Sequence, residues 1–274
     1  MAAINAKDVM SLRNKTGLAM MACKKALTEA DGDPVKAEEN LRKSLKGKMD
    51  TKVDRAAGEG RIEIAKSDDG ATAVIVELRA ETDFTAKNEK FIEATKQIAQ
   101  LALGMASGST DPTAEMTEII DNLRITTGEN ISLGRIEKFE TSGGSTVYGQ
   151  YVHHDGKTGV LIQAEGEVGD EVLRQVAMHV TAAFPRPLGV TPDDIPTEMV
   201  EKERKFRIDQ AVESGKPQEI AEKMVEGGMR KFFAEVALLE QAFVIDPSKT
   251  IKELIGAGGS VKDFRRWEVG ETGA

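Results

Sequence analysis

Apolar residues in this chain follow two different spacings, and each spacing predicts a different kind of element. Up to about residue 50 they recur three or four positions apart, which is typical of helices that bury one face. After Gly58, short apolar runs at 61–65 and 73–78 flank a Ser-Asp-Asp-Gly turn at 67–70, which predicts a β-hairpin. Helical spacing then returns over 88–103, where we expect a helix.

Start signals divide the N-terminal segment into three short helices. Asn5 is a suitable N-cap for the first helix, and Asp33 followed by Pro34 marks the start of the third. Residues 43–55 are mostly charged and polar, so they form either a linker or a solvated extension of the third helix. The segment therefore predicts a small three-helix module.

The order of hairpin and helix occurs a second time, which indicates an internal duplication. Apolar runs at 147–152 and 159–164 flank a His-His-Asp-Gly turn, and a helix with apolar residues from Val172 to Val180 follows. The copies differ after the second strand of each hairpin. The first copy has Phe84 there, whereas the second copy has no aromatic residue at 165–170.

The remaining segments complete a mixed pattern of helices and strands. A charged run at 201–205 prevents its helix from being buried on all sides, so this helix and the next are predicted to protrude as a hairpin. A closing strand at 266–269 is expected to join the sheet of the second copy. The other predicted elements are a helix over 115–123, a strand over 131–139, helices over 197–212 and 218–243 with a turn at 214–217, a short helix over 250–255 and a turn at 256–259.

Composition limits the classes of partner. The chain has 274 residues, of which 40% are hydrophobic, so it can bury a core and is expected to form two or more structural units. Its net charge of −9 gives no support for sequence-independent binding to nucleic acid. The single cysteine, Cys23, excludes an intramolecular disulfide, and no apolar stretch is long enough to span a membrane. We expect a soluble cytoplasmic protein with no direct nucleic-acid or membrane partner.

The known motifs for catalysis are missing from the sequence. It contains no Gly-x4-Gly-Lys-Ser/Thr phosphate loop, no Gly-x-Gly-x-x-Gly, no Gly-x-Ser-x-Gly and no His-Glu-x-x-His. The three histidines, His153, His154 and His179, have no spacing that suggests a metal site. We therefore expect no catalytic residue, no cofactor and no metal ion, and we look for function in contact surfaces.

Two apolar features are candidates for such surfaces. Phe84 lies at the junction of a strand and a helix, where the pattern predicts a solvent-facing loop and where binding residues are common. It either contacts a partner or folds back onto the following helix as a hydrophobic staple. Met20 and Met21 form either an adaptable patch for a partner or part of the core of the N-terminal module. Cys23 is most simply a small buried apolar residue.

Three motifs, in order along the chain, resemble signatures of the elongation factor Ts family. They are Arg13 to Gly17 with Met20 to Leu27, then Glu81 to Asn88, then Leu238 to Val244. The resemblance implies an α+β fold, with a ubiquitin-associated-like three-helix module, a core of two related α+β subdomains with small antiparallel sheets, and an inserted helical hairpin. The implied boundaries are 1–54 for the N-terminal domain, 55–140 for the first subdomain, 141–188 with 244–274 for the second, and 189–243 for the hairpin.

The resemblance implies a guanine nucleotide exchange factor, without catalytic chemistry of its own, for the GTPase EF-Tu in its GDP-bound and nucleotide-free forms. In the family a Thr-Asp-Phe-Val tip enters the GTPase and displaces its Mg²⁺. The matching residues are Thr82, Asp83, Phe84 and Thr85. Further partner contacts are expected from Arg13, Met20, Met21, His153 and His154.

The chain departs from the family pattern at a few places. Thr85 stands where Val is usual, and Ala242 stands where Pro is expected. The chain ends soon after Glu271, so a C-terminal helical module that some members add is expected to be absent.

A hypothesis of a different class stays open at the level of sequence. The N-terminal helices are then a general interaction module of a scaffold protein, and the charged helical hairpin mediates oligomerisation. Under both hypotheses the hairpin is a candidate surface for a homodimer. Acceleration of nucleotide exchange distinguishes the two.

Overall fold

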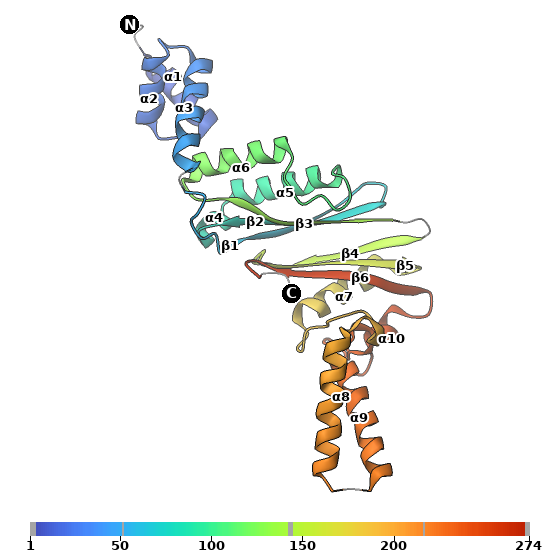
Figure 1. The fold of residues 1–274 in the computed structure, drawn as a ribbon. Coiled ribbons are helices and arrows are strands. Elements are labelled where there is room, and N and C mark those ends of the chain that lie inside the picture. The colour runs from blue at the N-terminus through green and yellow to red at the C-terminus, as the bar shows by residue number, and fades with distance from the viewer. Residues whose placement is uncertain (1–3, 51, 142–144, 216, 272–274) are drawn as a thin grey trace. The chain divides into compact units, whose positions relative to one another are not determined.

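The computed structural model describes residues 4–50, 52–141, 145–215 and 217–271 (Figure 1). The chain divides into two compact units. Unit 1 consists of Met1–Glu63, Val76–Glu137 and Val269–Ala274, and unit 2 consists of Ile64–Ile75 and Lys138–Glu268. Helices combine with two small antiparallel sheets of three strands each, which confirms the predicted α+β class.

The N-terminal part of unit 1 is a bundle of three helices, α1 (Ala6–Thr16), α2 (Met20–Glu29) and α3 (Pro34–Asp50) (Figure 1). Both predicted caps are present: Asn5 accepts from the backbone N–H of Lys7, and Asp33 accepts from those of Val35 and Lys36. Because α3 continues to Asp50, the first part of the polar segment is a helix extension and not a linker. The bundle buries Val9, Leu12, Cys23, Ala26, Leu27, Ala30, Ala37 and Leu41.

The first sheet has the strand order β1-β2-β3. Helices separate β2 from β3 in sequence, as the predicted order of elements has it. Gly70 turns the hairpin with a φ of +68°, a conformation that glycine adopts without steric cost. Helix α5 buries Phe91 and Ile98 along one face. The elements are β1 (Glu59–Lys66), β2 (Thr72–Ala80), α4 (Asp83–Ala86), α5 (Glu89–Leu103), α6 (Ala114–Thr127) and β3 (Ser132–Glu140).

A fully buried carboxylate fixes strands β2 and β3 within unit 1. Glu77 accepts from Nε of Arg79 at 2.9 Å and from Nε of Arg135 at 2.5 Å, and it also accepts from the backbone N–H of Gly270 at 2.9 Å. Gly134 makes room for this group, because a Cβ there would lie 2.9 Å from the Glu77 carboxyl carbon. A buried charge with several partners in this geometry favours one register of the strands.

The second sheet has the order β4-β5-β6, and both pairs are antiparallel. The closing strand was predicted to join this sheet, and it does, but it begins at Gly259 instead of residue 266. Its first half is polar, so the apolar pattern did not mark it, whereas pairing with β5 holds it along its whole length. The elements are β4 (Thr146–Val152), β5 (Thr158–Gly166), α7 (Asp170–Ala182), α10 (Ile251–Ile255) and β6 (Gly259–Glu268).

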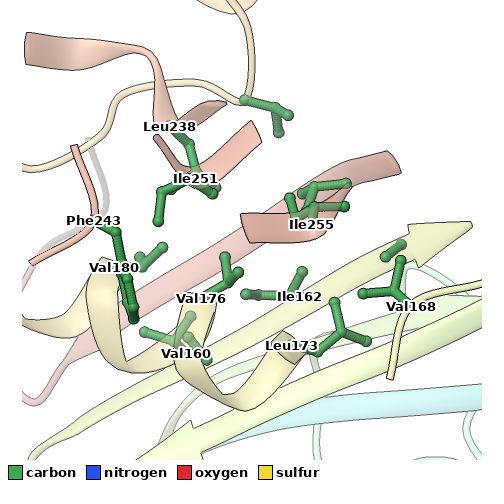
Figure 2. Packing of buried hydrophobic residues seen from close by; sticks show 14 residues of the cluster. Val160, Ile162, Val168, Leu173, Val176, Val180, Leu238, Phe243, Ile251 and Ile255 are labelled. Atoms are coloured by element: carbon green, nitrogen blue, oxygen red, sulfur yellow. The ribbon is translucent and has the colours of Figure 1, made fainter. Parts of the chain in front are cut away.

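The core of unit 2 lies between β5, α7 and the segment 238–255 (Figure 2). Strand β5 contributes Val160 and Ile162, and α7 contributes Leu173 and Val176. Gly149 of β4 allows α7 to approach closely, because a Cβ there would lie 2.5 Å from the Cβ of Leu173. Other members of this core are Val180, Leu238, Phe243, Ile251 and Ile255.

The predicted helical hairpin consists of α8 (Thr197–Glu213) and α9 (Gln218–Val236), which lie side by side (Figure 1). The prediction that the second helix extends to residue 243 is wrong. Ala237 is extended and pairs with Gly189 as an isolated parallel bridge. The backbone N–H of Leu238 donates to Gly189 O at 2.9 Å, so hydrogen bonds to another segment replace those of the helix. Two short 3₁₀ turns, Pro192–Asp194 and Leu238–Glu240, flank the hairpin.

The buried imidazole of His179 ties α7 to the segment after the hairpin. Its Nδ1 accepts from the backbone N–H of Val244 at 3.2 Å, and its Nε2 lies 2.9 Å from Gln241 Oε1. Because Nδ1 accepts, the proton is on Nε2 and is donated to Gln241. Burial lowers the pKa of His179, and the hydrogen bond to Gln241 opposes this shift in part. This histidine is therefore a neutral structural group.

Candidate partner-binding site

The Phe84 segment is one turn of helix and not the loop that the pattern predicted. Helix α4 starts after Thr82, whose side chain accepts from the backbone N–H of Thr85 at 3.3 Å. This N-cap satisfies one of the free backbone donors of the turn. Thr85 and Ala86 are buried and anchor the turn, while the Phe84 side chain is 83% exposed. An exposed ring does not pack on α5, so the hydrophobic staple is absent.

Asp83 opens this turn and is half-buried beside the ring. Its Oδ2 accepts from Lys87 Nζ at 2.7 Å across one helical turn. A carboxylate at the first position of a helix is favourable, since the backbone N–H groups there carry partial positive charge. The tip thus presents an apolar ring with a charged pair next to it.

Two residues that the sequence analysis missed hold the start of the turn. The backbone N–H of Thr82 donates to Glu129 Oε2 at 3.2 Å, and the Thr82 hydroxyl donates to Glu129 Oε1 at 2.7 Å. Next to it, the backbone N–H of Asn130 donates to Glu81 Oε1 at 2.6 Å. No local pattern indicates these contacts, because the partners lie on separate segments between different elements.

The same short segment after α6 also fixes the chain between α3 and β1. The buried side chain of Asn130 donates to the carbonyl oxygens of Val53 and Arg55, at 2.9 and 2.7 Å. Lys52 Nζ donates to the carbonyl oxygen of Gly128 at 2.8 Å. Residues 128–130 therefore bind both the α4 turn and the segment that leads from the three-helix bundle.

The N-terminal candidates lie on the surface of the bundle. Met20 and Met21 are 46% and 73% exposed, and neither belongs to the core cluster of the bundle. Arg13 is exposed on α1. Met21 borders a shallow hollow along α2 whose other lining residues are Lys24, Lys25, Thr28 and Glu29. This surface combines flexible apolar side chains with positive charge, a combination that suits an amphipathic partner surface.

His153 and His154 occupy the turn between β4 and β5, in unit 2. Their ring centroids are 4.3 Å apart, and the Tyr151 hydroxyl lies 3.3 Å from His153 Nδ1. His154 is exposed and His153 half-buried. The structure places Thr82, Asp83, Phe84, Thr85, Arg13, Met20 and Met21 in unit 1, so these two histidines form a separate candidate.

The second copy of the duplicated pattern has no exposed ring at the position of the α4 turn. After β5 the chain passes through Val168, which is buried in the core of unit 2 (Figure 2). A Cβ at Gly259 would lie 1.9 Å from Val168 Cγ2, so β6 packs directly against this segment. The segment serves packing, and only the first copy presents an apolar tip in this place.

The residues that the structure describes lack two further features. Within these residues, no group of three or more His, Cys, Asp and Glu side chains has a geometry that could hold a metal ion. In the same part of the chain, no helix combines the length and the apolar character that crossing a membrane requires.

Comparison with known proteins gives one family. A family described as "Elongation factor TS" matches residues 81–271, which begin at the α4 tip. Elongation factor Ts of Hydrogenovibrio crunogenus is 46% identical over 281 residues, covering 98% of this chain and 92% of that relative. The same factor of Thioalkalivibrio sulfidiphilus is 41% identical over 98% of this chain and 92% of the relative. Elongation factor Ts of Yersinia pestis is 43% identical over 99% of this chain and 93% of the relative. The chain therefore belongs to the elongation factor Ts family and is an elongation factor of protein biosynthesis.

Proposed function

We propose that this chain is a guanine nucleotide exchange factor that binds EF-Tu·GDP and promotes replacement of GDP by GTP. The observation that carries this proposal is the exposed ring of Phe84 on an anchored helical turn. A ring of this size in water contributes little to the fold, whereas a partner that covers it gains most of its hydrophobic free energy. Membership of the family supports EF-Tu as that partner.

Exchange of this kind needs no catalytic acid or base. The factor lowers the affinity of EF-Tu for GDP by binding the nucleotide-free form more tightly than the GDP-bound form. By linkage, GDP must weaken binding of the factor to the same extent. The chain is therefore not an enzyme with chemistry of its own, and we assign it no catalytic residue, cofactor or resident metal ion.

The tip acts as a wedge next to the Mg²⁺ of EF-Tu. A nucleotide-bound Mg²⁺ requires a nearly ideal octahedral geometry at short distances, so a small displacement of the surrounding protein segments removes much of its stabilisation. Phe84 supplies the volume, and Asp83 hydrogen-bonds partner groups that fix the orientation. Thr82 and Thr85 complete the tip and hold the turn from within.

A second contact strengthens the complex. Met20, Met21 and Arg13 bind the GTPase through the three-helix bundle, which acts as a ubiquitin-associated-like domain over residues 1–54. His153 and His154 contact another domain of EF-Tu. The protein works in the cytoplasm without a nucleic-acid partner, and the α8–α9 hairpin is the surface for any homodimer.

The test is the release of a fluorescent GDP from EF-Tu, with and without this chain. The wild-type chain is expected to accelerate release strongly, and Phe84→Ala is expected to lose most of that acceleration. Phe184→Ala is the matched control, because Phe184 is also a highly exposed phenylalanine, in unit 2. It is expected to act like the wild type.

Two outcomes would contradict the proposal. A folded wild-type chain that leaves GDP release unchanged would reject exchange and leave the scaffold hypothesis. Equal losses in Phe84→Ala and Phe184→Ala would show that the tip has no special role. The wedge further requires that the Phe84→Ala defect shrink when Mg²⁺ is removed with a chelator, since the ion is then already absent.

A further inference from the structure

We infer that Glu129 is a positioning residue for the exchange tip, acting through Thr82. The inference rests on the proposed function and extends it to a residue outside the tip. Glu129 lies in the bend between α6 and β3, and both of its carboxylate oxygens accept hydrogen bonds from Thr82, one from the backbone N–H and one from the hydroxyl. Thr82 directly precedes α4, and Glu129 follows α6, so the two residues are 47 positions apart in sequence.

The direction of these hydrogen bonds explains why a carboxylate is needed. A hydroxyl has one proton to donate and lone pairs with which to accept. An ionised carboxylate only accepts, so it draws the Thr82 proton toward Glu129. The lone pairs of the same oxygen then face the Thr85 N–H, which completes the N-cap of α4. Glu129 therefore orients the cap, and the cap orients the turn that presents Phe84.

Glu129 is itself held in place. Helix α6 ends at Thr127, and its cap residue Gly128 has a left-handed φ of +76° that turns the chain toward Glu129. The backbone N–H of Glu129 donates to the Thr127 hydroxyl at 3.3 Å. On the other side Asn130 is buried and bonded to Glu81 and to the segment after α3. A residue whose chain neighbours are held on both sides can fix the geometry of a contact residue.

The position of Glu129 separates this role from a purely structural one. Its side chain is half-buried, and among the described residues its carboxylate hydrogen-bonds Thr82 alone. Loss of the carboxylate is therefore expected to loosen the α4 turn more than the rest of unit 1. A hydrogen bond to a charged acceptor contributes enough free energy that its loss is expected to lower the exchange rate by about tenfold or more.

The first experiment measures EF-Tu-bound GDP release with Glu129→Ala and Glu129→Gln in the full-length chain. We expect Glu129→Ala to lose about tenfold in exchange rate at subsaturating chain. Glu129→Gln keeps one carbonyl acceptor and is expected to lose less. The matched control is Glu93→Ala, because Glu93 is an exposed glutamate on α5 of the same unit, with a side-chain contact to Gln97. It is expected to leave exchange unchanged.

The decisive readout is the double variant with Phe84→Ala. If Glu129 acts by positioning Phe84, then Glu129→Ala causes no further loss of exchange once the ring is gone. A general loss of stability would instead add to the Phe84→Ala defect. Hydrogen exchange in the free chain gives a second readout: the Thr82 amide is expected to lose about tenfold in protection in Glu129→Ala, while amides in the middle of α5 keep theirs.

Each contrary result has a definite meaning. Wild-type activity in Glu129→Ala would overturn the positioning role alone, and so would additive losses in the double variant. A wild-type chain without exchange activity would reject the proposed function and, with it, this role of Glu129. If Glu129→Ala fails to fold, Thr82→Val tests the same link, because it removes the hydroxyl at nearly constant volume; full exchange activity in that variant would also overturn the inference.

Discussion

Phe84 and Phe91 offer a direct test of the claim that the tip serves binding and not folding. The Phe84 side chain is 83% exposed, so about a sixth of its surface leaves water on folding. Full burial of phenylalanine is worth about 1.5–3 kcal/mol, which scales to about 0.3–0.5 kcal/mol for this ring. Phe91 lies on the next helix and is completely buried. Its replacement by alanine is expected to cost about 3–5 kcal/mol, because it also leaves a cavity.

The assay is urea unfolding of the wild type, Phe84→Ala and Phe91→Ala, followed by far-ultraviolet circular dichroism. The midpoint for Phe84→Ala is expected to stay close to that of the wild type, and the midpoint for Phe91→Ala to fall clearly. The same Phe84→Ala sample is then used for GDP release from EF-Tu. A loss of more than about 1.5 kcal/mol in Phe84→Ala would refute the reasoning, because the ring would then have to be packed within the chain.

Three more predictions concern other parts of the chain. Replacing Met20 and Met21 together by alanine should weaken EF-Tu binding about tenfold in calorimetric titration, and a folded variant with unchanged affinity would remove that surface. Because burial lowers the pKa of His179, the unfolded chain binds a proton more readily than the folded chain, so stability falls as the pH drops through about 6.5, the ordinary value. Urea midpoints at pH 7.5 and 5.5 should differ less in His179→Gln than in the wild type; equal differences would contradict this. Gly149→Ala should destabilise unit 2 by about 1–3 kcal/mol, since its Cβ would meet Leu173; an unchanged melting temperature would contradict that packing.

The sequence predicted helices and strands well where one face of the element is buried and the other is exposed to solvent. Strand β1 alternates in this way, and the turn that follows it needs the positive φ that glycine supplies. The starts of α1 and α3 were predictable for a similar reason, because Asn5 and Asp33 act through local backbone donors. These signals lie within a few residues of the structure that they cause.

Errors arose where a distant segment decides the local structure. The apolar run after Val236 has the composition of a continuing helix, but hydrogen bonds to Gly189 make Ala237 extended. A short apolar run is compatible with either structure, so spacing alone does not distinguish them. The first half of β6 is polar, and only its register with β5 makes it a strand.

The residues of the candidate site also differ in whether the sequence alone indicates them. Phe84 was identifiable because a large ring stands at a junction between elements. Thr82 and Thr85 were identified only through the family motif, and their capping hydrogen bond became visible in the structure. Glu129 was not identifiable, since an isolated acidic residue after a glycine is an ordinary surface feature in sequence. Its meaning depends on Thr82, which the fold alone brings within hydrogen-bond distance.

The hydrogen bonds that join Asn130 and Gly128 to residues 52–55 have a consequence for any partner that contacts both the three-helix bundle and the Phe84 tip. Once one contact has formed, the second forms at an effective concentration that depends on the connection between the two. A chain segment tied down by Asn130 and Lys52 loses little entropy at that moment, because it was ordered beforehand. Loss of these hydrogen bonds would leave the bundle contact and the tip contact each intact, and it would still lower the combined affinity for a partner that uses both.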